Sequence, residues 1–304
     1  MPMTPQQIVS RLTGAIAFPV TPFQRNLALD VDGLRANVRT ILTYPPAAIV
    51  AAGGTGELYS LTPAEHLEVI RIVVEEARGD VPVIAGVGFN ATLGAALATQ
   101  AESAGADGLL VFPPYYPNAD DHGLEEYYKR LASATELAVL VYSRDWFHPG
   151  PALVERIAAN PTVVGWKDGQ GDVRRLQTLM HVVGDRLRWI GGAGDDLVPA
   201  YYAAGIRAYT SSVSNLAPRL SLALHDRAAA ADAAGLRSLM DVVLPLYAFR
   251  ARRRGYEVSA MKALMELLGL YGGPVRPPLP EIRHDEMPLL REIAEAFRPW
   301  TAQR

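Results

Sequence analysis

Short apolar runs alternate with helical patterns along this chain, and this alternation restricts the folds that are open to it. Most of the runs are continuously apolar, which is typical of parallel strands buried on both faces. Eight runs can be read from the sequence, at 14–20, 47–53, 82–88, 107–113, 138–143, 163–168, 188–192 and 208–213. Strands and helices that alternate at this spacing predict βα units and a parallel sheet.

The helical segments carry local start signals. Thr62 precedes Pro63 and has Glu65 three residues later, a capping box that predicts a helix beginning here. Asp195 or Asp196 is the predicted N-cap of a later helix. Further helices are predicted after the last strand, at 217–231, 235–250, 257–269 and 285–298.

The number of βα units favours a closed barrel over an open sheet. A doubly wound sheet is expected to carry a GxGxxG turn after an early strand. The nearest stretches here, "GGTGEL" and "GVGFNA", do not have that spacing. We therefore expect an α/β protein with a (β/α)8 TIM barrel at 1–230, followed by C-terminal helices at 231–304 that pack on the barrel.

The composition excludes several kinds of site. The chain has no cysteine, which rules out disulfides, thiolate nucleophiles and cysteine-based metal centres. Its six histidines form no HExxH motif or close pair, so we expect no metal site. A net charge of -3 argues against a nucleic-acid partner. The N-terminus has no apolar signal core and no run has the length of a membrane span, so we expect a cytoplasmic protein without a membrane partner.

Positive charge is concentrated in one stretch, "FRARRRGYE", at 249–257. We interpret this stretch first as a solvated helix end. Anion binding or a contact between subunits is the second interpretation.

Lys167 lies at the end of the sixth predicted strand, and barrel active sites form at such carboxyl ends. If its side chain points into the barrel mouth, partial desolvation lowers its pKa and frees the amine as a nucleophile. The alternative is a solvated Lys–Asp pair with Asp168. The other two lysines, Lys129 and Lys262, fall in helical segments and are expected on the surface or on a helix face. Trp166 should point away from Lys167, into the layer between barrel and helices.

Two other strand ends carry candidate groups. The stretch "GGTGE", at 53–57, can form a nest of N–H groups for a carboxylate or phosphate, or merely a tight turn. Glu57 is expected to hydrogen-bond within this loop. Tyr142 shares a strand face with Leu140, so it is either a core residue or a proton shuttle, and the same alternatives apply to Tyr116.

Together these strand ends resemble the pyruvate-aldolase group of Schiff-base barrels, which includes dihydrodipicolinate synthase and N-acetylneuraminate lyase. That group has a G-[TSG]-T-G-E loop after strand 2, a tyrosine on strand 5 and a Lys-Asp or Lys-Glu pair on strand 6. The matching positions here are Gly53–Glu57, Tyr142 and Lys167–Asp168, and the likeness covers the whole chain. Two positions depart from the pattern: Gly54 replaces a hydroxyl residue of the synthases, and Ser143 replaces an asparagine.

The resemblance implies roles for the matched residues. Lys167 would form an imine with a 2-oxo group, and Tyr142 would move protons. Thr55, with Gly54 and Gly56 in the same loop, would hold the carboxylate next to that carbonyl. The resemblance also implies chemistry without a metal or organic cofactor, a small-molecule 2-oxo acid as partner, and a homotetramer or homodimer.

Within the group, "GGTGELYSLTPAEH", "WKDGQGD" and "GPVRPPL" look most like a branch that dehydrates and decarboxylates a six-carbon 2-oxo-3-deoxy diacid. A diacid needs a second anion site, for which the candidates are Arg144, Ser143, Ser211 and Ser212. Arg144 could instead form a surface ion pair with Asp145, and the serines could be hydrogen-bonding groups of strand ends. The alternatives are a pyruvate-releasing aldolase, a synthase of the same group, or a sensor that binds sugar acids without catalysis.

Overall fold

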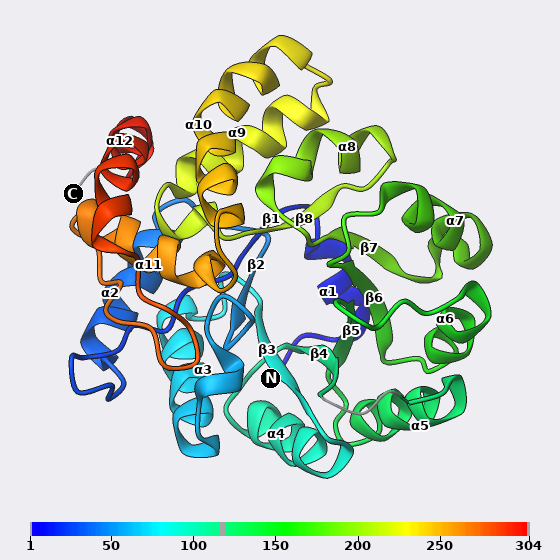
Figure 1. Cartoon of the computed structure of the whole chain (residues 1–304). Helices are drawn as coiled ribbons and strands as arrows, with labels where there is room; N and C mark the ends of the chain where they lie inside the picture. The colour runs from blue at the N-terminus through cyan, green and yellow to red at the C-terminus, as the bar shows by residue number, and fades with distance from the viewer. Residues whose placement is uncertain (1, 116–118, 303–304) are drawn as a thin grey trace.

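Eight parallel strands close into a barrel in the computed structural model of this chain, which describes residues 2–115 and 119–302 (Figure 1). The strands pair in chain order, and β8 pairs with β1 to complete the ring. Their bounds are β1 Gly14–Ala17, β2 Ala48–Ala51, β3 Val83–Phe89, β4 Gly108–Pro114, β5 Ala138–Ser143, β6 Val163–Asp168, β7 Arg188–Gly191 and β8 Ala208–Ser211. The predicted TIM barrel is confirmed, and β5 and β6 have the predicted limits.

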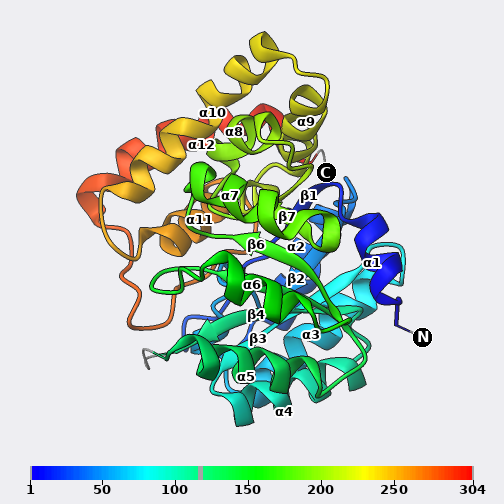
Figure 2. The same cartoon turned by 90° about the vertical axis from the view of Figure 1, so that its right-hand side faces the viewer.

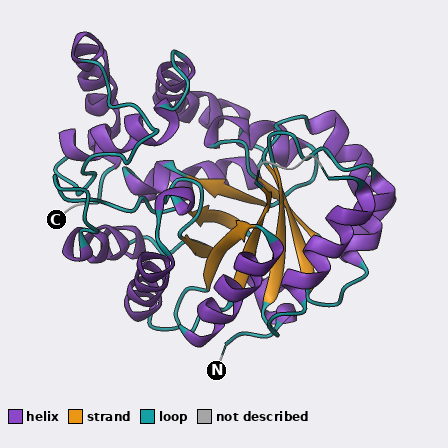
Figure 3. Ribbon diagram, turned by 60° about the horizontal axis from the view of Figure 1, so that its bottom comes forward, coloured by secondary structure: helices purple, strands orange, loops and turns teal. Residues whose placement is uncertain are grey.

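Helices surround the strands on all sides, as the purple ring around the orange strands in Figure 3 shows. They are α1 Pro5–Arg11, α2 Val31–Leu42, α3 Pro63–Ala77, α4 Ala91–Ser103, α5 Asp121–Ala132, α6 Pro151–Ala158, α7 Val173–Val183 and α8 Val198–Ala203. The capping box of α3 is confirmed, because Thr62 accepts from the Glu65 N–H while Glu65 accepts from the Thr62 N–H. Here the local sequence determines where the helix begins.

One end of the barrel is closed by α1. Its Ile8 and Leu12 are fully buried among the residues of the barrel interior, which include Leu140 and Tyr142. A second apolar cluster, which contains Trp166, lies between the strands and the outer helices. The predicted orientation of Trp166 is therefore confirmed. Figure 2 shows α1 at the right and α11 at the left, so the end of the barrel away from α1 is left for a site.

The C-terminal part of the chain forms four helices, α9 Pro218–Ala229, α10 Ala233–Ala251, α11 Tyr256–Leu267 and α12 Met287–Phe297. They follow the predicted segments closely. Helix α9 packs against β1, and α10 contacts the turn Asp195–Leu197 that follows β7. The C-terminal helices thus reach the carboxyl ends of the strands. Within the described part of the chain, no helix has the length and apolarity needed to cross a membrane.

The predicted cap of α8 is wrong. Helix α8 has no side-chain cap, and Asp195 is fully buried one turn before it. The Asp195 carboxylate accepts the N–H groups of Ser212 and Val213 and the hydroxyl of Tyr247 on α10. This aspartate joins the ends of two strands to a C-terminal helix, which the local sequence did not indicate.

Candidate active site

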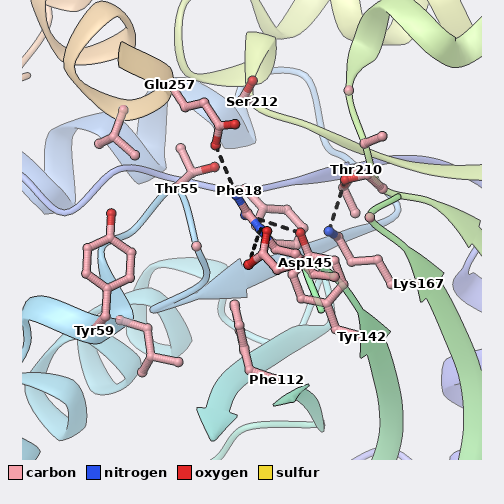
Figure 4. Close-up of a pocket in the computed structure, with 18 of the residues that line it drawn as sticks. Phe18, Thr55, Tyr59, Phe112, Tyr142, Asp145, Lys167, Thr210, Ser212 and Glu257 are labelled. Atoms are coloured by element: carbon pink, nitrogen blue, oxygen red, sulfur yellow. Dashed lines mark hydrogen bonds and ion pairs between the residues drawn. The ribbon is translucent and has the colours of Figure 1, made fainter. Parts of the chain in front are cut away.

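A cavity of about 1060 Å³ opens at the carboxyl ends of the strands. It is bounded by residues of the strand ends and by side chains from α10 and α11. Among the residues singled out from the sequence, Gly54, Thr55, Tyr142, Arg144, Lys167 and Ser212 line it. Figure 4 shows several of these side chains converging on the same space from different elements.

Lys167 extends into the interior of the cavity from the end of β6. It is 3% exposed, and its Nζ lies 3.3 Å from the centre of the Tyr142 ring. The Nζ donates a hydrogen bond to the Gly192 carbonyl, 3.1 Å away. Gly192 permits this approach, because a Cβ at that position would lie 2.5 Å from the Lys167 Cγ. Burial lowers the pKa of Lys167, and the balance remains downward although Tyr142 opposes the shift. The alternative interpretation, a lysine side chain exposed to solvent, is not compatible with this burial.

Tyr142 is the cross-strand neighbour of Lys167, since the two residues are paired in the register of β5 and β6. Its hydroxyl accepts a hydrogen bond from Arg144 Nη1 at 3.4 Å. Burial by itself raises the pKa of Tyr142, but the cations of Lys167 and Arg144 outweigh burial and lower it. A phenol with a lowered pKa next to an amine can exchange protons with it at moderate pH.

Arg144 has three partners. Besides the Tyr142 hydroxyl, its guanidinium forms ion pairs with Asp145 at 3.3 Å and with Glu257 of α11 at 3.2 Å. The anionic form of Tyr142 raises the pKa of Arg144 most, and the two carboxylates add to this effect. The expected surface pair with Asp145 is present, and the same side chain also lines the cavity.

Glu57 hydrogen-bonds within the "GGTGE" loop through its backbone N–H, which donates to the Gly54 carbonyl, whereas its side chain has partners outside the loop. The carboxylate of Glu57 is fully buried, forms an ion pair with Lys262 of α11 at 2.5 Å and accepts the Arg276 N–H. Lys262 lies on a helix face, as predicted, but the face is buried and the side chain is only 1% exposed. Gly54 and Thr55 line the cavity, whereas Gly56 faces the carbonyl of Pro19 and does not.

Two of the predicted substrate-binding serines point away from the cavity. Ser143 Oγ accepts the indole N–H of Trp166 and donates to the Lys167 carbonyl. Ser211 Oγ is bonded to Ser221 Oγ and accepts the Ser214 N–H. Both predictions are corrected by strand alternation, because each serine follows a residue that points inward.

Several cavity residues were missed. Thr210, the inward neighbour of Ser211, lines the cavity, and alternation along β8 could have identified it. Tyr247 and Arg250 of α10 and Glu257 of α11 also line it. The basic stretch at 249–257 includes Arg250 and Glu257 but not Tyr247. Tyr116 lies outside the described residues.

Asp168 supports the loop after β6. Its carboxylate accepts the N–H groups of Gln170 and Gly171 and the hydroxyl of Tyr201.

In the ranges 2–115 and 119–302, no group of three or more His, Asp or Glu side chains is arranged to hold a metal ion.

The chain is similar to known proteins over nearly its whole length. A probable 5-dehydro-4-deoxyglucarate dehydratase of Bradyrhizobium sp. is 39% identical over 300 residues, which cover 97% of this chain and 96% of the relative. A protein of the same description from Methylobacterium radiotolerans is 40% identical over 289 residues, or 92% and 94% of the two chains.

Solved structures and family comparison agree with this similarity. A dihydrodipicolinate synthase from Oceanobacillus iheyensis superimposes with a TM-score of 0.91 at 27% identity, covering 97% of this chain and 99% of that one. The sequence model of the dihydrodipicolinate synthetase family matches residues 11–297. The resemblance inferred from three strand ends is confirmed over the full barrel and the C-terminal helices. The chain therefore belongs to the dihydrodipicolinate synthetase family of enzymes.

Proposed function

We propose that this enzyme converts 5-dehydro-4-deoxyglucarate into 2,5-dioxopentanoate, carbon dioxide and water through an imine on Lys167. The observation that carries the proposal is the Lys167 amine, which is buried, has a lowered pKa and lies against Tyr142. A buried amine that loses its proton readily is a nucleophile for a 2-oxo group. The description of the relatives as 5-dehydro-4-deoxyglucarate dehydratases supports this choice of substrate.

The imine accounts for both dehydration and decarboxylation. Attack of the neutral amine on the 2-oxo carbon releases one water and gives a cationic imine. Loss of an α-proton then forms an enamine, which expels the β-hydroxyl as a second water. The electrons of the bond to the distal carboxylate move through the conjugated system to the nitrogen, and carbon dioxide leaves. Protonation at carbon and hydrolysis, which consumes one water, release the product with a net yield of one water.

The neighbouring side chains supply proton transfer and orientation. Tyr142 can take the proton of the attacking amine and return it to the leaving oxygen, while Arg144 stabilises the phenolate between these steps. Thr55 and the N–H groups of the Gly54 loop are the proposed site for the carboxylate adjacent to the 2-oxo group. Fixed donors of this kind hold the reacting carbon in place over the amine.

A second candidate is a pyruvate-releasing aldolase or a synthase of the same family. The 27% identity to a dihydrodipicolinate synthase favours it. The products distinguish the two proposals. Incubation with 5-dehydro-4-deoxyglucarate should release carbon dioxide and an aldehyde, and release of pyruvate would contradict the dehydratase proposal.

Borohydride trapping followed by mass analysis tests the imine itself. The peptide that carries Lys167 should gain the mass of the reduced adduct, and Lys167→Ala should abolish both the adduct and turnover. Lys129→Met is the matched control, because Lys129 is an exposed helix residue whose partner is Glu126. An adduct at another position, or full turnover by Lys167→Ala, would falsify the mechanism.

We further propose that the enzyme acts in the cytoplasm and that it forms a homotetramer or homodimer, the assembly that its resemblance to the pyruvate-aldolase group implied. Light scattering coupled to size-exclusion chromatography measures the assembly directly. A monomer at micromolar concentration would contradict this part of the proposal.

A further inference from the structure

Arg250, on the last turn of α10, is a buried cation that forms no ion pair with the residues that the structure describes. The side chain lines the cavity, and the residue is 9% exposed. Its Nη1 and Nη2 both lie 3.1 Å from Ser212 Oγ, and the guanidinium lies 5.0 Å from the centre of the Tyr247 ring. Its Nε has no hydrogen-bond partner among the described residues.

Two nearby carboxyl groups interact with Arg250 only at a distance. The charge of Arg250 opposes the rise that burial causes in the pKa of Asp195 and Asp196, but neither carboxylate forms an ion pair with it in the described part of the chain. Asp195 is instead bonded to two backbone N–H groups and to Tyr247. Two neighbours of Arg250 in the basic stretch, Arg252 and Arg253, are both paired with Glu286. Arg250 thus differs from them in burial and in lacking a carboxylate.

A guanidinium in this environment is suited to binding an anion. Burying a cation is costly unless it is paired and its donors are hydrogen-bonded. A single serine hydroxyl satisfies few of the five N–H donors that a guanidinium carries. A carboxylate that enters the cavity can accept two parallel hydrogen bonds from such a group.

Arg144, the distal-anion candidate from the sequence, is less suited to this task. Its guanidinium already has two carboxylate partners and the Tyr142 hydroxyl. It therefore acts on Tyr142 and carries no unsatisfied charge. Arg250 lies with Ser212 beyond the end of β8 and faces the same cavity as Lys167.

We propose that Arg250, oriented by Ser212 and Tyr247, binds the distal carboxylate of a 2-oxo diacid whose carbonyl reacts with Lys167. This inference rests on the proposed function and identifies the group that selects a diacid over a monoacid. The basic stretch read from the sequence as a solvated helix end would then include a specificity residue.

The chemistry predicts which kinetic constant Arg250 controls. The distal carboxylate loses its negative charge as carbon dioxide forms, so its attraction to Arg250 weakens in that transition state. An interaction that is strongest in the bound substrate lowers KM without raising kcat. Removal of Arg250 should therefore raise KM without lowering kcat.

The binding test compares two six-carbon 2-oxo acids that cannot be dehydrated, 2-oxoadipate and 2-oxohexanoate. They differ only in the distal carboxylate, so the ratio of their half-saturating concentrations in borohydride trapping isolates its contribution. In the wild-type enzyme 2-oxoadipate should be favoured by at least about tenfold. Arg250→Met should abolish this preference, and Arg254→Met, which alters an exposed arginine of the same stretch, should retain it.

The kinetic test uses 5-dehydro-4-deoxyglucarate. Arg250→Met should raise KM by about 10- to 100-fold without lowering kcat. Arg250→Lys keeps the charge but not the two-pronged geometry, so its diacid preference should fall severalfold. This variant decides the question if circular dichroism shows that Arg250→Met does not fold.

Three results would overturn the inference: no diacid preference in the wild type, a preference unchanged in Arg250→Met or Arg250→Lys, or equal weakening of 2-oxoadipate, 2-oxohexanoate and pyruvate. The last result would assign Arg250 a purely structural role. Failure of the proposed function looks different. In that case the wild-type enzyme would show no adduct on Lys167, or would release pyruvate in place of carbon dioxide.

Discussion

The reactivity of Lys167 depends on neighbours that act in opposite directions on its pKa. Burial lowers the pKa, the anionic form of Tyr142 raises it, and the cation of Arg144 lowers it again. Tyr142 responds in turn to both cations, so the two protons are coupled and the titration belongs to the pair. Arg144 lowers the pKa of both groups, so it promotes loss of a proton from the pair without contacting the amine.

The pH profile of imine formation should reveal this effect of Arg144. Only the neutral amine attacks a carbonyl, so the rate of adduct formation should rise as the pH increases through the pKa of Lys167. Arg144→Met removes a cation that lowers that pKa, and the rising limb should move to higher pH. Trapping of pyruvate with cyanoborohydride over a pH series measures the shift. Arg144→Lys retains the charge and should restore most of the profile, whereas an unshifted profile in Arg144→Met would contradict the prediction.

Strand elements explain both the success and the errors of prediction from sequence. The runs that became β5 and β6 are continuously apolar, so their type and limits were evident, and the position of Lys167 followed from them. The direction in which the last side chain of each strand points also follows from alternation along the strand. Ser143 and Ser211 were assigned to the cavity, although alternation places them in the outer layer and places Thr210 inside.

Contacts made by the C-terminal helices could not be predicted in the same way. Arg250, Glu257 and Lys262 lie on helices whose sequences predict helical structure but not the barrel residues that they meet. Their partners are separated from them by many residues, as in the pair of Lys262 with Glu57. Tertiary packing of α10 and α11 determines these contacts, and a local sequence pattern does not predict that packing.

The Glu57–Lys262 ion pair joins the loop after β2 to α11, and its energetics can be separated by a double-mutant cycle. Both side chains are buried, so Lys262→Met should leave an uncompensated carboxylate and lower the free energy of unfolding by about 3–5 kcal/mol. The double variant Glu57→Gln/Lys262→Met removes both charges and should recover much of this loss. Urea unfolding monitored by circular dichroism gives the values for Glu57→Gln, Lys262→Met and the double variant, with Lys129→Met as the surface control. Additive losses in the double variant would show that the two charges are not coupled.

Considered as a whole, the molecule has an apolar cluster between the strands and the outer helices that extends across the expected boundary near residue 230. The apolar cluster that contains Val141 and Trp166 also contains Phe249, Leu264 and Phe297 of the C-terminal helices. Polar links cross the same boundary, among them Tyr247 to Asp195, Arg250 to Ser212, Lys262 to Glu57 and Arg276 to Glu65. The cavity has walls from both parts, so the site exists only when both are folded.

A shared core predicts that the barrel and the C-terminal helices unfold together. Trp300 follows α12 and reports on the C-terminal part, whereas Trp166 and Trp189 are buried in the barrel. Comparing urea unfolding of the wild type and Trp300→Phe by tryptophan fluorescence isolates the Trp300 signal, and circular dichroism follows the whole chain. Because contiguous packing couples the two parts, the Trp300 signal, the remaining tryptophan signal and the dichroism should share one midpoint and one slope. An earlier transition for Trp300 would show that residues 231–304 form a separately unfolding unit, and loss of borohydride trapping at that earlier transition would assign the site to their docking.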